Sequence, residues 1–103
     1  MVKRPRQVKV SPYAVYSIGW VRNLTFYHEN AWGAMDAGTR KIEVNLSYKA
    51  EEDRRVTLAH EIAHAMMFDA GFAMHEEQQA EVLGRALIYF LRNNPNVVDY
   101  LRG

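Results

Sequence analysis

The sequence predicts an α+β fold, in which a small antiparallel sheet of about three strands precedes two packed helices. The first half consists of short segments rich in aromatic and β-branched residues, separated by Gly and Asn, which is typical of strands. The second half carries apolar residues at helical spacing over two long stretches. A chain of 103 residues has room for one modest core. We therefore expect residues 1–103 to form a single domain.

The predicted strands occupy residues 8–10, 15–18, 24–27, 31–35 and 42–46. Polar and apolar residues alternate from Lys41 to Leu46, as they do in a half-buried strand. Residues 36–39 form a predicted turn, so the segments on either side of it give the clearest hairpin. Residues 1–7 are basic and lack an apolar pattern, and we expect them to be a flexible, solvated arm.

Two long helices and a final short turn are predicted in the second half. The first helix begins with acidic residues 51–53, which the helix dipole favours there, and ends at Gly71. The second helix runs from about residue 76 to residue 92, and Pro95 prevents its continuation. Residues 97–101 add a short helical turn. The two long helices are expected to pack antiparallel and to approach closely at Gly84, which has no side chain.

Composition excludes several classes of protein. The net charge is +1 and there is no cysteine, so disulfides, thiolate catalysis and a cysteine-type zinc site are excluded, and nucleic acid is not expected as the main partner. No stretch approaches the length of a membrane span and no secretory signal is present. We expect a cytoplasmic protein without membrane contact. The large aromatic side chains are expected in the core, namely those of Trp20, Trp32, Phe68, Phe72 and Phe90.

The principal motif is His60-Glu61-Ile62-Ala63-His64, which lies within the first predicted helix. Histidines four residues apart lie one turn apart on one helix face, where two imidazoles can bind a single zinc ion. Glu61 projects beside them, and a carboxylate there can act as general base on a water molecule. Two helical histidines can also be ordinary surface or core residues. The glutamate between them and the carboxylates downstream favour a metal site.

A catalytic zinc ion needs a third protein ligand, for which the candidates are His75, Glu76, Glu77 and Glu81. An antiparallel helix pair places Glu81 level with His64, and Glu77 nearer the connection between the helices. One of these two carboxylates can bind the ion while the other orients a histidine. This simple geometry favours Glu81. The alternative is that the glutamates form a solvated acidic face at the start of a helix.

From about residue 33 to residue 100, the chain resembles the compact HExxH proteins of phages and prophages, which are related to minimal gluzincins and ImmA/IrrE-type metallopeptidases. The resemblance rests on residues 33–36, 41–44, 57–65, 77–81 and 91–95. It implies a short sheet packed on the HExxH helix, one zinc ion per chain and hydrolysis of peptide bonds in a host cytoplasm. In such proteins a glutamate followed three residues later by a small apolar residue tends to bind the metal. That pattern points to Glu77, and Glu81 remains its near equal.

The predicted function is therefore that of a zinc metallopeptidase acting on a peptide or protein substrate. His60 and His64 bind zinc together with Glu77 or Glu81, and Glu61 acts as general base. The alternative is a zinc-binding module of little or no activity that acts by binding a partner protein. A third interpretation is a nucleic-acid accessory protein that uses the basic arm.

The strand predicted at residues 42–46 directly precedes the metal-binding helix. If it is an edge strand, it can hold an extended peptide by strand addition. Outward-facing Glu43 or Asn45 would then set the substrate preference.

Overall fold

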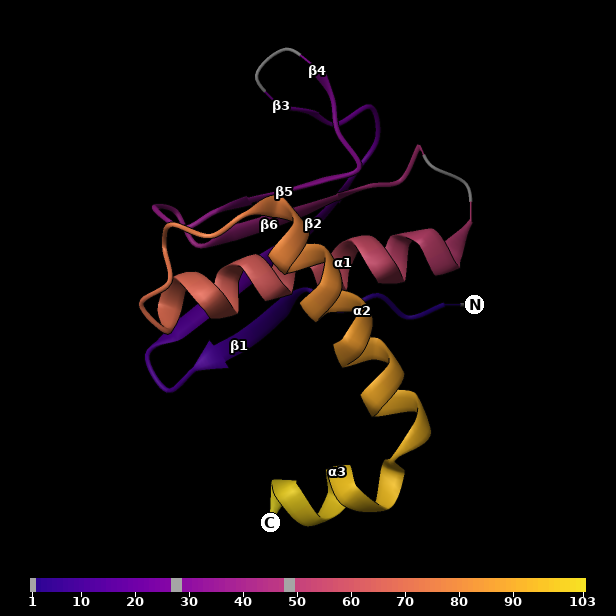
Figure 1. The fold of residues 1–103 in the computed structure, drawn as a ribbon. Coiled ribbons are helices and arrows are strands. Elements are labelled where there is room, and N and C mark those ends of the chain that lie inside the picture. The colour runs from indigo at the N-terminus through magenta and orange to yellow at the C-terminus, as the bar shows by residue number, and fades with distance from the viewer. Residues whose placement is uncertain (1, 27–28, 48–49) are drawn as a thin grey trace.

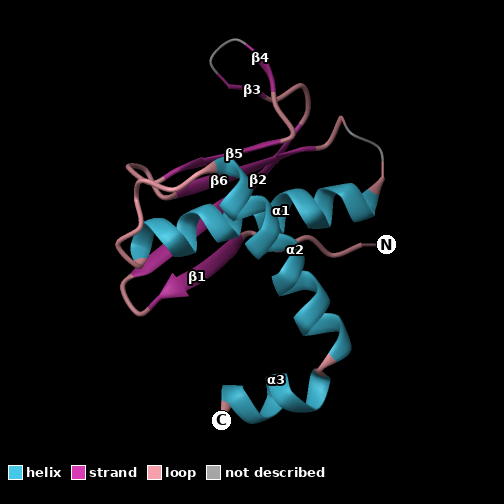
Figure 2. Ribbon diagram, in the orientation of Figure 1, coloured by secondary structure: helices cyan, strands magenta, loops and turns pink. Residues whose placement is uncertain are grey.

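A four-stranded sheet with helix α1 packed against one face forms the centre of the computed structural model, and α2 crosses over α1 (Figure 1). The structure describes residues 2–26, 29–47 and 50–103. The strands of the sheet are β1 (Gln7–Ser11), β2 (Ala14–Val21), β6 (Lys41–Asn45) and β5 (Gly33–Asp36), in that spatial order. A separate ribbon pairs β3 (Thr25–Phe26) with β4 (Glu29–Asn30). The helices are α1 (Glu51–Asp69), α2 (Glu77–Asn93) and α3 (Pro95–Arg102), as Figure 2 shows.

The α+β class and the order of sheet before helices confirm the prediction. The sheet has four strands and is mixed rather than antiparallel, because β6 pairs in parallel with β2 and antiparallel with β5. This arrangement gives β6 an interior place, where its apolar residues Ile42 and Val44 are fully buried. In the region predicted as strand 24–27, β3 covers Thr25–Phe26, and Tyr27 lies outside the described residues.

The core lies between the sheet and α1. Tyr16, Ile42 and Val44 are the largest fully buried side chains, and Ala65 of α1 packs against the same cluster. The predicted aromatic core is wrong in most of its members, since Trp32, Phe68, Phe72 and Phe90 are exposed and Trp20 is only half-buried. On the helix side the core is made of alanines, which α1 buries at positions 59, 63 and 65, and the large ring that it holds is that of Tyr16 from the sheet.

Gly84 of α2 lies directly against the backbone of α1. A Cβ atom at this position would be 2.9 Å from the amide nitrogen of His60 and 3.0 Å from the carbonyl carbon and oxygen of Ala59. The predicted close approach at Gly84 is thereby confirmed. Ala80, one turn earlier, is fully buried, so this contact brings the first turns of α2 over the histidines of α1.

The ends of the helices follow from local sequence. Gly71 has a φ of +97° and stops α1, with its N–H donating to the Phe68 carbonyl and the Phe72 N–H donating to the Met67 carbonyl. These two bonds form the Schellman arrangement that a glycine in this conformation permits. Glu76 and Gln79 form a reciprocal capping box at the start of α2.

The N-terminal residues make defined contacts with the body of the protein. The Arg4 guanidinium pairs with the Glu51 carboxylate at 2.8 Å, and the indole N–H of Trp20 donates to the Pro5 carbonyl at 2.7 Å. Strand β1 begins at Gln7, inside the range predicted as an arm. The flexibility predicted for residues 1–7 stays a prediction. Within the described ranges, no helix combines the length and apolarity that crossing a membrane requires.

Candidate metal centre

His60 and His64 project from one face of α1 toward the start of α2. Their Nε2 atoms are 3.1 Å apart and their rings meet edge to face. The spacing of four residues places them one turn apart, and the close contact at Gly84 holds α2 above them. Both side chains are only 13% exposed, so their ring nitrogens face protein groups rather than bulk water.

Glu77, the first residue of α2, completes a group of three donors. Its Oε1 lies 2.5 Å from Nε2 of His60, and its Oε2 lies 3.0 Å from Nε2 of His64. Donors in tetrahedral contact with zinc at about 2.0–2.2 Å are about 3.3 Å apart, so changes of less than about 1 Å would admit an ion. His60, His64 and Glu77 therefore lie close enough together to hold one metal ion.

Glu81 binds the other side of the His60 ring. Its Oε2 lies 2.8 Å from Nδ1 of His60, and its Oε1 accepts a hydrogen bond from Nε of Arg85 at 2.6 Å. Glu81 thus occupies the position of a carboxylate that orients a metal-binding histidine. The sequence allowed either carboxylate as the third ligand. Glu77 contacts the Nε2 atoms of both histidines, whereas Glu81 contacts Nδ1 of His60.

His75 supports His64 in the same way. Nε2 of His75 lies 2.6 Å from Nδ1 of His64, and Nδ1 of His75 lies 2.5 Å from the carbonyl oxygen of Phe72. Because that carbonyl can only accept, Nδ1 of His75 carries the proton and its Nε2 is the acceptor. His64 therefore donates through Nδ1. A carboxylate receives the Nδ1 proton of His60 in the same way, so the Nε2 atoms of both histidines are the ones that face Glu77 and would bind an ion once the proton shared with that carboxylate is released.

Neighbouring charges and hydrogen bonds shift the pKa values of His60 and Glu77. Burial by itself lowers the pKa of His60, but the hydrogen bonds that His60 donates to Glu77 and Glu81, together with the charges of Glu61 and Glu77, outweigh it, so the pKa is raised. Burial raises the pKa of Glu77, and its bonds to His64 and His60 reverse that effect and leave it lowered. A proton on His60 thus compensates the negative charge of Glu77, and a bound metal ion would replace that proton.

Glu61 is the buried acid of the site. Its side chain leaves α1 toward β5, where Oε2 would be 3.1 Å from a Cβ atom at Gly33. Glu61 is 7% exposed, and burial raises its pKa to about 7, with the charge of His60 opposing this shift. A larger residue at position 33 would also meet Thr57, at 2.7 Å. Gly33 is therefore what lets the carboxylate and the edge of the sheet lie side by side.

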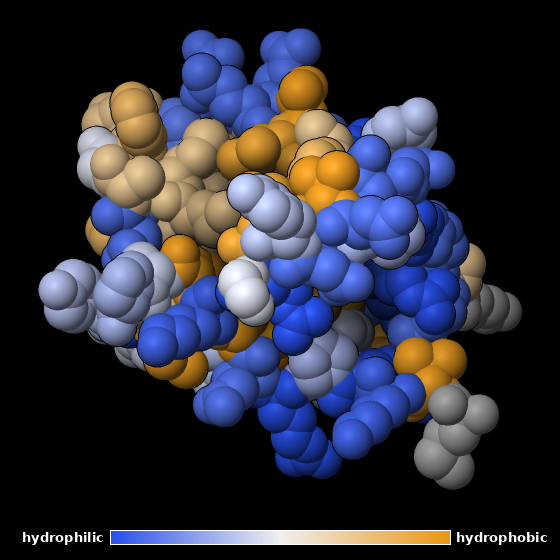
Figure 3. All heavy atoms as spheres, turned by 90° about the horizontal axis from the view of Figure 1, so that it is seen from below, coloured by the Kyte–Doolittle hydropathy of each residue, from blue (hydrophilic) through white to orange (hydrophobic). Residues whose placement is uncertain are grey.

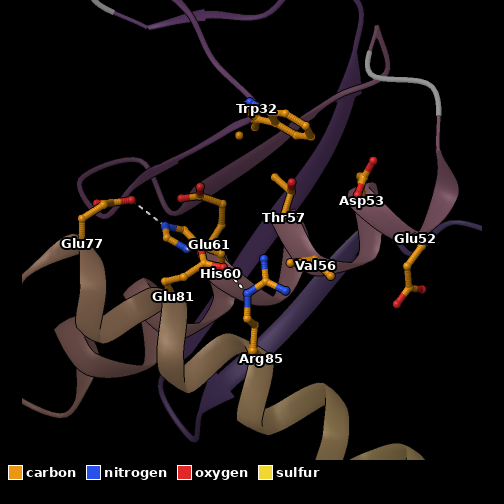
Figure 4. A pocket seen from close by; sticks show the side chains of 11 residues that line it. Trp32, Glu52, Asp53, Val56, Thr57, His60, Glu61, Glu77, Glu81 and Arg85 are labelled. Carbon is orange, nitrogen blue, oxygen red and sulfur yellow. Dashed lines mark hydrogen bonds and ion pairs between the residues drawn. The ribbon is translucent and has the colours of Figure 1, made fainter.

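Two cavities meet at the site, and both are lined by Gly33, Glu61 and Glu77. The larger, of about 650 Å³, extends past His60 toward Trp32, and Figure 4 shows Thr57, Val56 and Arg85 around it. The smaller, of about 370 Å³, extends past His64 along β5. The donor group thus lies between two cavities, with Glu61 and Glu77 lining both.

The structure brings some of the predicted site residues together and gives others a different role. His60, Glu61, His64 and Glu77 come together at the junction of the two cavities, whereas Glu76 caps α2 instead. Sequence reasoning missed the roles of Gly33 and Arg85. The spacing of Arg85 four residues after Glu81 is a signal that could have indicated their ion pair. No local pattern connects Gly33 with Glu61.

Comparison with known proteins identifies no relative: no family model, curated protein or solved structure matches this chain. The arrangement of donors and cavities is therefore the basis for assigning a function.

Proposed function

We propose that this protein is a zinc-dependent peptidase in which His60, His64 and Glu77 hold the ion and Glu61 acts as general base. The observation that carries the proposal is the convergence of three donor groups beside a buried carboxylate, at the point where two cavities meet. Two imidazole nitrogens and one carboxylate oxygen leave a coordination position open, which is the pattern of catalytic rather than structural zinc sites.

The choice of zinc follows from the donors. Imidazole suits zinc and other late transition metals, whereas calcium and magnesium prefer sites built from oxygen. A zinc ion held there supplies Lewis-acid polarisation of a carbonyl and makes a water molecule more acidic. Glu81 and His75 fix the ring orientations of His60 and His64 through Nδ1, so neither imidazole has to reorganise when it binds.

Glu61 is suited to move a proton. A carboxyl group with a pKa of about 7 is close to half ionised at neutral pH, where it can accept a proton in one step and return it in the next. A bound cation would favour its ionised form. In the proposed reaction Glu61 takes a proton from the attacking water molecule and delivers it to the leaving amine. Its position in the floor shared by both cavities gives it access to both groups.

The edge of β5 offers a place for an extended peptide. Strand addition at residues 42–46 is expected only for an edge strand, and this condition is not met, since β6 lies between β2 and β5. In the described sheet, β5 occupies one edge, and its residues Gly33, Ala34 and Met35 line the smaller cavity. A peptide paired with β5 would pass over Glu61, with side chains in the cavities on either side.

The test is metal content followed by peptide cleavage. Wild-type protein is expected to contain about one zinc ion per chain and to cleave members of a random-sequence peptide library, read by mass spectrometry. Glu61→Gln should keep the zinc and lose cleavage at least about a hundredfold, because proton transfer is removed. Glu29→Gln is the matched control, since Glu29 is exposed on β4 and lines neither cavity.

The other outcomes separate the alternatives. A protein that holds zinc but cleaves no peptide in the library is a zinc-binding module, and the peptidase proposal fails. A protein that holds no transition metal, even after refolding with zinc, refutes both functions. Equal cleavage by wild type and Glu61→Gln would show that this carboxylate is not the general base.

A further inference from the structure

Exposed apolar side chains lie along α2 from Leu83 to Leu91 and on α3. Leu83, Leu87, Phe90 and Leu91 follow the helical spacing of one stripe, yet only Leu87 among them is half-buried, while the others are exposed. Seen from the side on which α3 lies, apolar side chains stand at the surface between polar ones (Figure 3). We define the C-terminal apolar face by its exposed members, which are Leu83, Phe90, Leu91, Val97, Tyr100 and Leu101.

The path of the chain explains why this face is left uncovered. Pro95 begins α3 and cannot continue the hydrogen bonding of α2, so the chain turns sharply at Asn94, whose φ is −137° and ψ is 55°. Figure 1 shows α2 extending beyond the sheet and α3 turning back beneath it, apart from the strands. As a result α3 buries none of its residues.

The size of the face corresponds to a protein interface. A side chain of this size has a surface of roughly 200 Å². Multiplied by the exposed fractions of the six residues, this gives an exposed area of about 650 Å². Two copies in contact would bury about 1,300 Å² in total, within the range of about 1,200–2,000 Å² for specific complexes. The summed area is slightly above the roughly 300–600 Å² of the largest apolar patch on a typical monomer, and patches of that size often serve a function.

The charges on these helices favour a second copy of the same chain over a charged partner. Residues 77–102 contain three acidic and three basic side chains, so the net charge of this segment is zero. Helices that lie on a membrane surface carry an excess of Lys and Arg, and this segment has no lysine. On α3, Asp99 and Arg102 lie beside the apolar stripe. In a two-fold contact Asp99 of one copy can meet Arg102 of the other, because such an interface is self-complementary.

We propose that two copies of this chain associate through the C-terminal apolar face, with α2 and α3 of one copy packed against those of the other. The metal centre lies at the opposite end of α2, at Glu77 and Glu81. Association therefore leaves the two cavities beside Glu61 open.

Leu101→Glu and Tyr89→Glu form a matched pair for testing the proposal. The two side chains are 69% and 70% exposed, and both variants introduce the same charge. Tyr89 points away from the stripe, since it lies about 120° around α2 from Leu83 at 100° per residue. Sedimentation velocity from low micromolar to near-millimolar concentration should show wild type and Tyr89→Glu as dimers. Leu101→Glu should raise the dimer dissociation constant at least about tenfold, with the helical circular dichroism unchanged.

Three results would overturn the proposal. One is a wild-type protein that stays monomeric over the whole concentration range. Another is a dimer that Leu101→Glu and Tyr89→Glu weaken equally, which would place the contact elsewhere or show that added charge alone acts. The third is a monomer that binds phospholipid vesicles through this face. If Leu101→Glu fails to fold, Phe90→Ser, beside Tyr89 but on the stripe, replaces it in the same comparison.

Discussion

Replacing Gly84 with alanine tests the contact that places α2 over the histidines. The added methyl carbon would lie 2.9 Å from the His60 amide nitrogen, and ordinary contact begins at 3.4 Å. The opposing atoms belong to the hydrogen-bonded backbone of α1, which cannot rotate away as a side chain can. Helix α2 must therefore move outward by about 0.5 Å, the difference between these two distances.

Two opposing free energies set the effect on stability. Overpacking at a rigid contact costs about 1–3 kcal/mol, and alanine stabilises a helix interior by about 1 kcal/mol relative to glycine. The expected net loss is about 1 kcal/mol, or a decrease in Tm of about 5 °C for a domain of this size. A shift of about 0.5 Å is also the limit of tolerance for a preorganised site. Because Glu77 and Glu81 move with α2, zinc affinity should fall about tenfold or more.

The assay compares metal-free thermal unfolding, followed by circular dichroism in the presence of a chelator, with zinc affinity measured by competition against a chromophoric chelator. Ala86→Gly, at an exposed position of the same helix, measures the propensity difference alone and should cost about 1 kcal/mol. If Gly84→Ala raised Tm by the amount that the control loses, and left zinc affinity unchanged, the argument from close packing would be refuted.

The remaining predictions concern protonation and support of the site. The pKa of Glu61 is about 7 in the native state and 4.5 ordinarily. Between pH 4.5 and pH 7 the native state therefore binds a proton that the unfolded state does not. Metal-free wild type should lose about 3 kcal/mol of unfolding free energy as the pH rises through that interval. Glu61→Gln should therefore be more stable than wild type at pH 8 but not at pH 4 in urea unfolding with chelator; equal differences at both pH values would contradict this. Because the pKa of His60 is raised above 6.5, zinc affinity should begin to fall while the pH is still above that value, and a constant affinity down to pH 5 would count against His60 as a ligand. His75→Phe should lower zinc affinity about 10–100-fold, whereas His75→Gln, which retains an acceptor for Nδ1 of His64, should lose less; equal losses would show that the acceptor is not what matters.

Much of the helical half was predictable because its signals are local. The acidic start of α1, Gly71 at its end and Pro95 after α2 act through the backbone of their own segment. The spacing of His60 and His64 places them on one face of any helix. Gly84 was predictive because a missing side chain beside the carboxylates indicates close packing wherever the partner helix lies.

The first half was harder to predict because strand order depends on distant partners. The hairpin predicted from residues 31–35 and 42–46 is the pair of β5 and β6, with bounds Gly33–Asp36 and Lys41–Asn45, but nothing local shows that β6 pairs with β2 as well. The expectation of an aromatic core failed for a related reason. Which ring enters the core depends on strand placement, and β2 places Tyr16 against the alanines that α1 buries.

By itself the sequence determined the two long helices, the paired histidines with Glu61 beside them, and a second helix that brings carboxylates close at Gly84. Only the tertiary structure decided that Glu77 faces both Nε2 atoms while Glu81 lies behind His60 at Nδ1. It also brought His75 to His64 and Gly33 to Glu61. The physical reason is that spacing along a helix fixes which residues share a face, whereas the side of an imidazole that a carboxylate reaches depends on the crossing of two helices and on the rotamers that their packing allows.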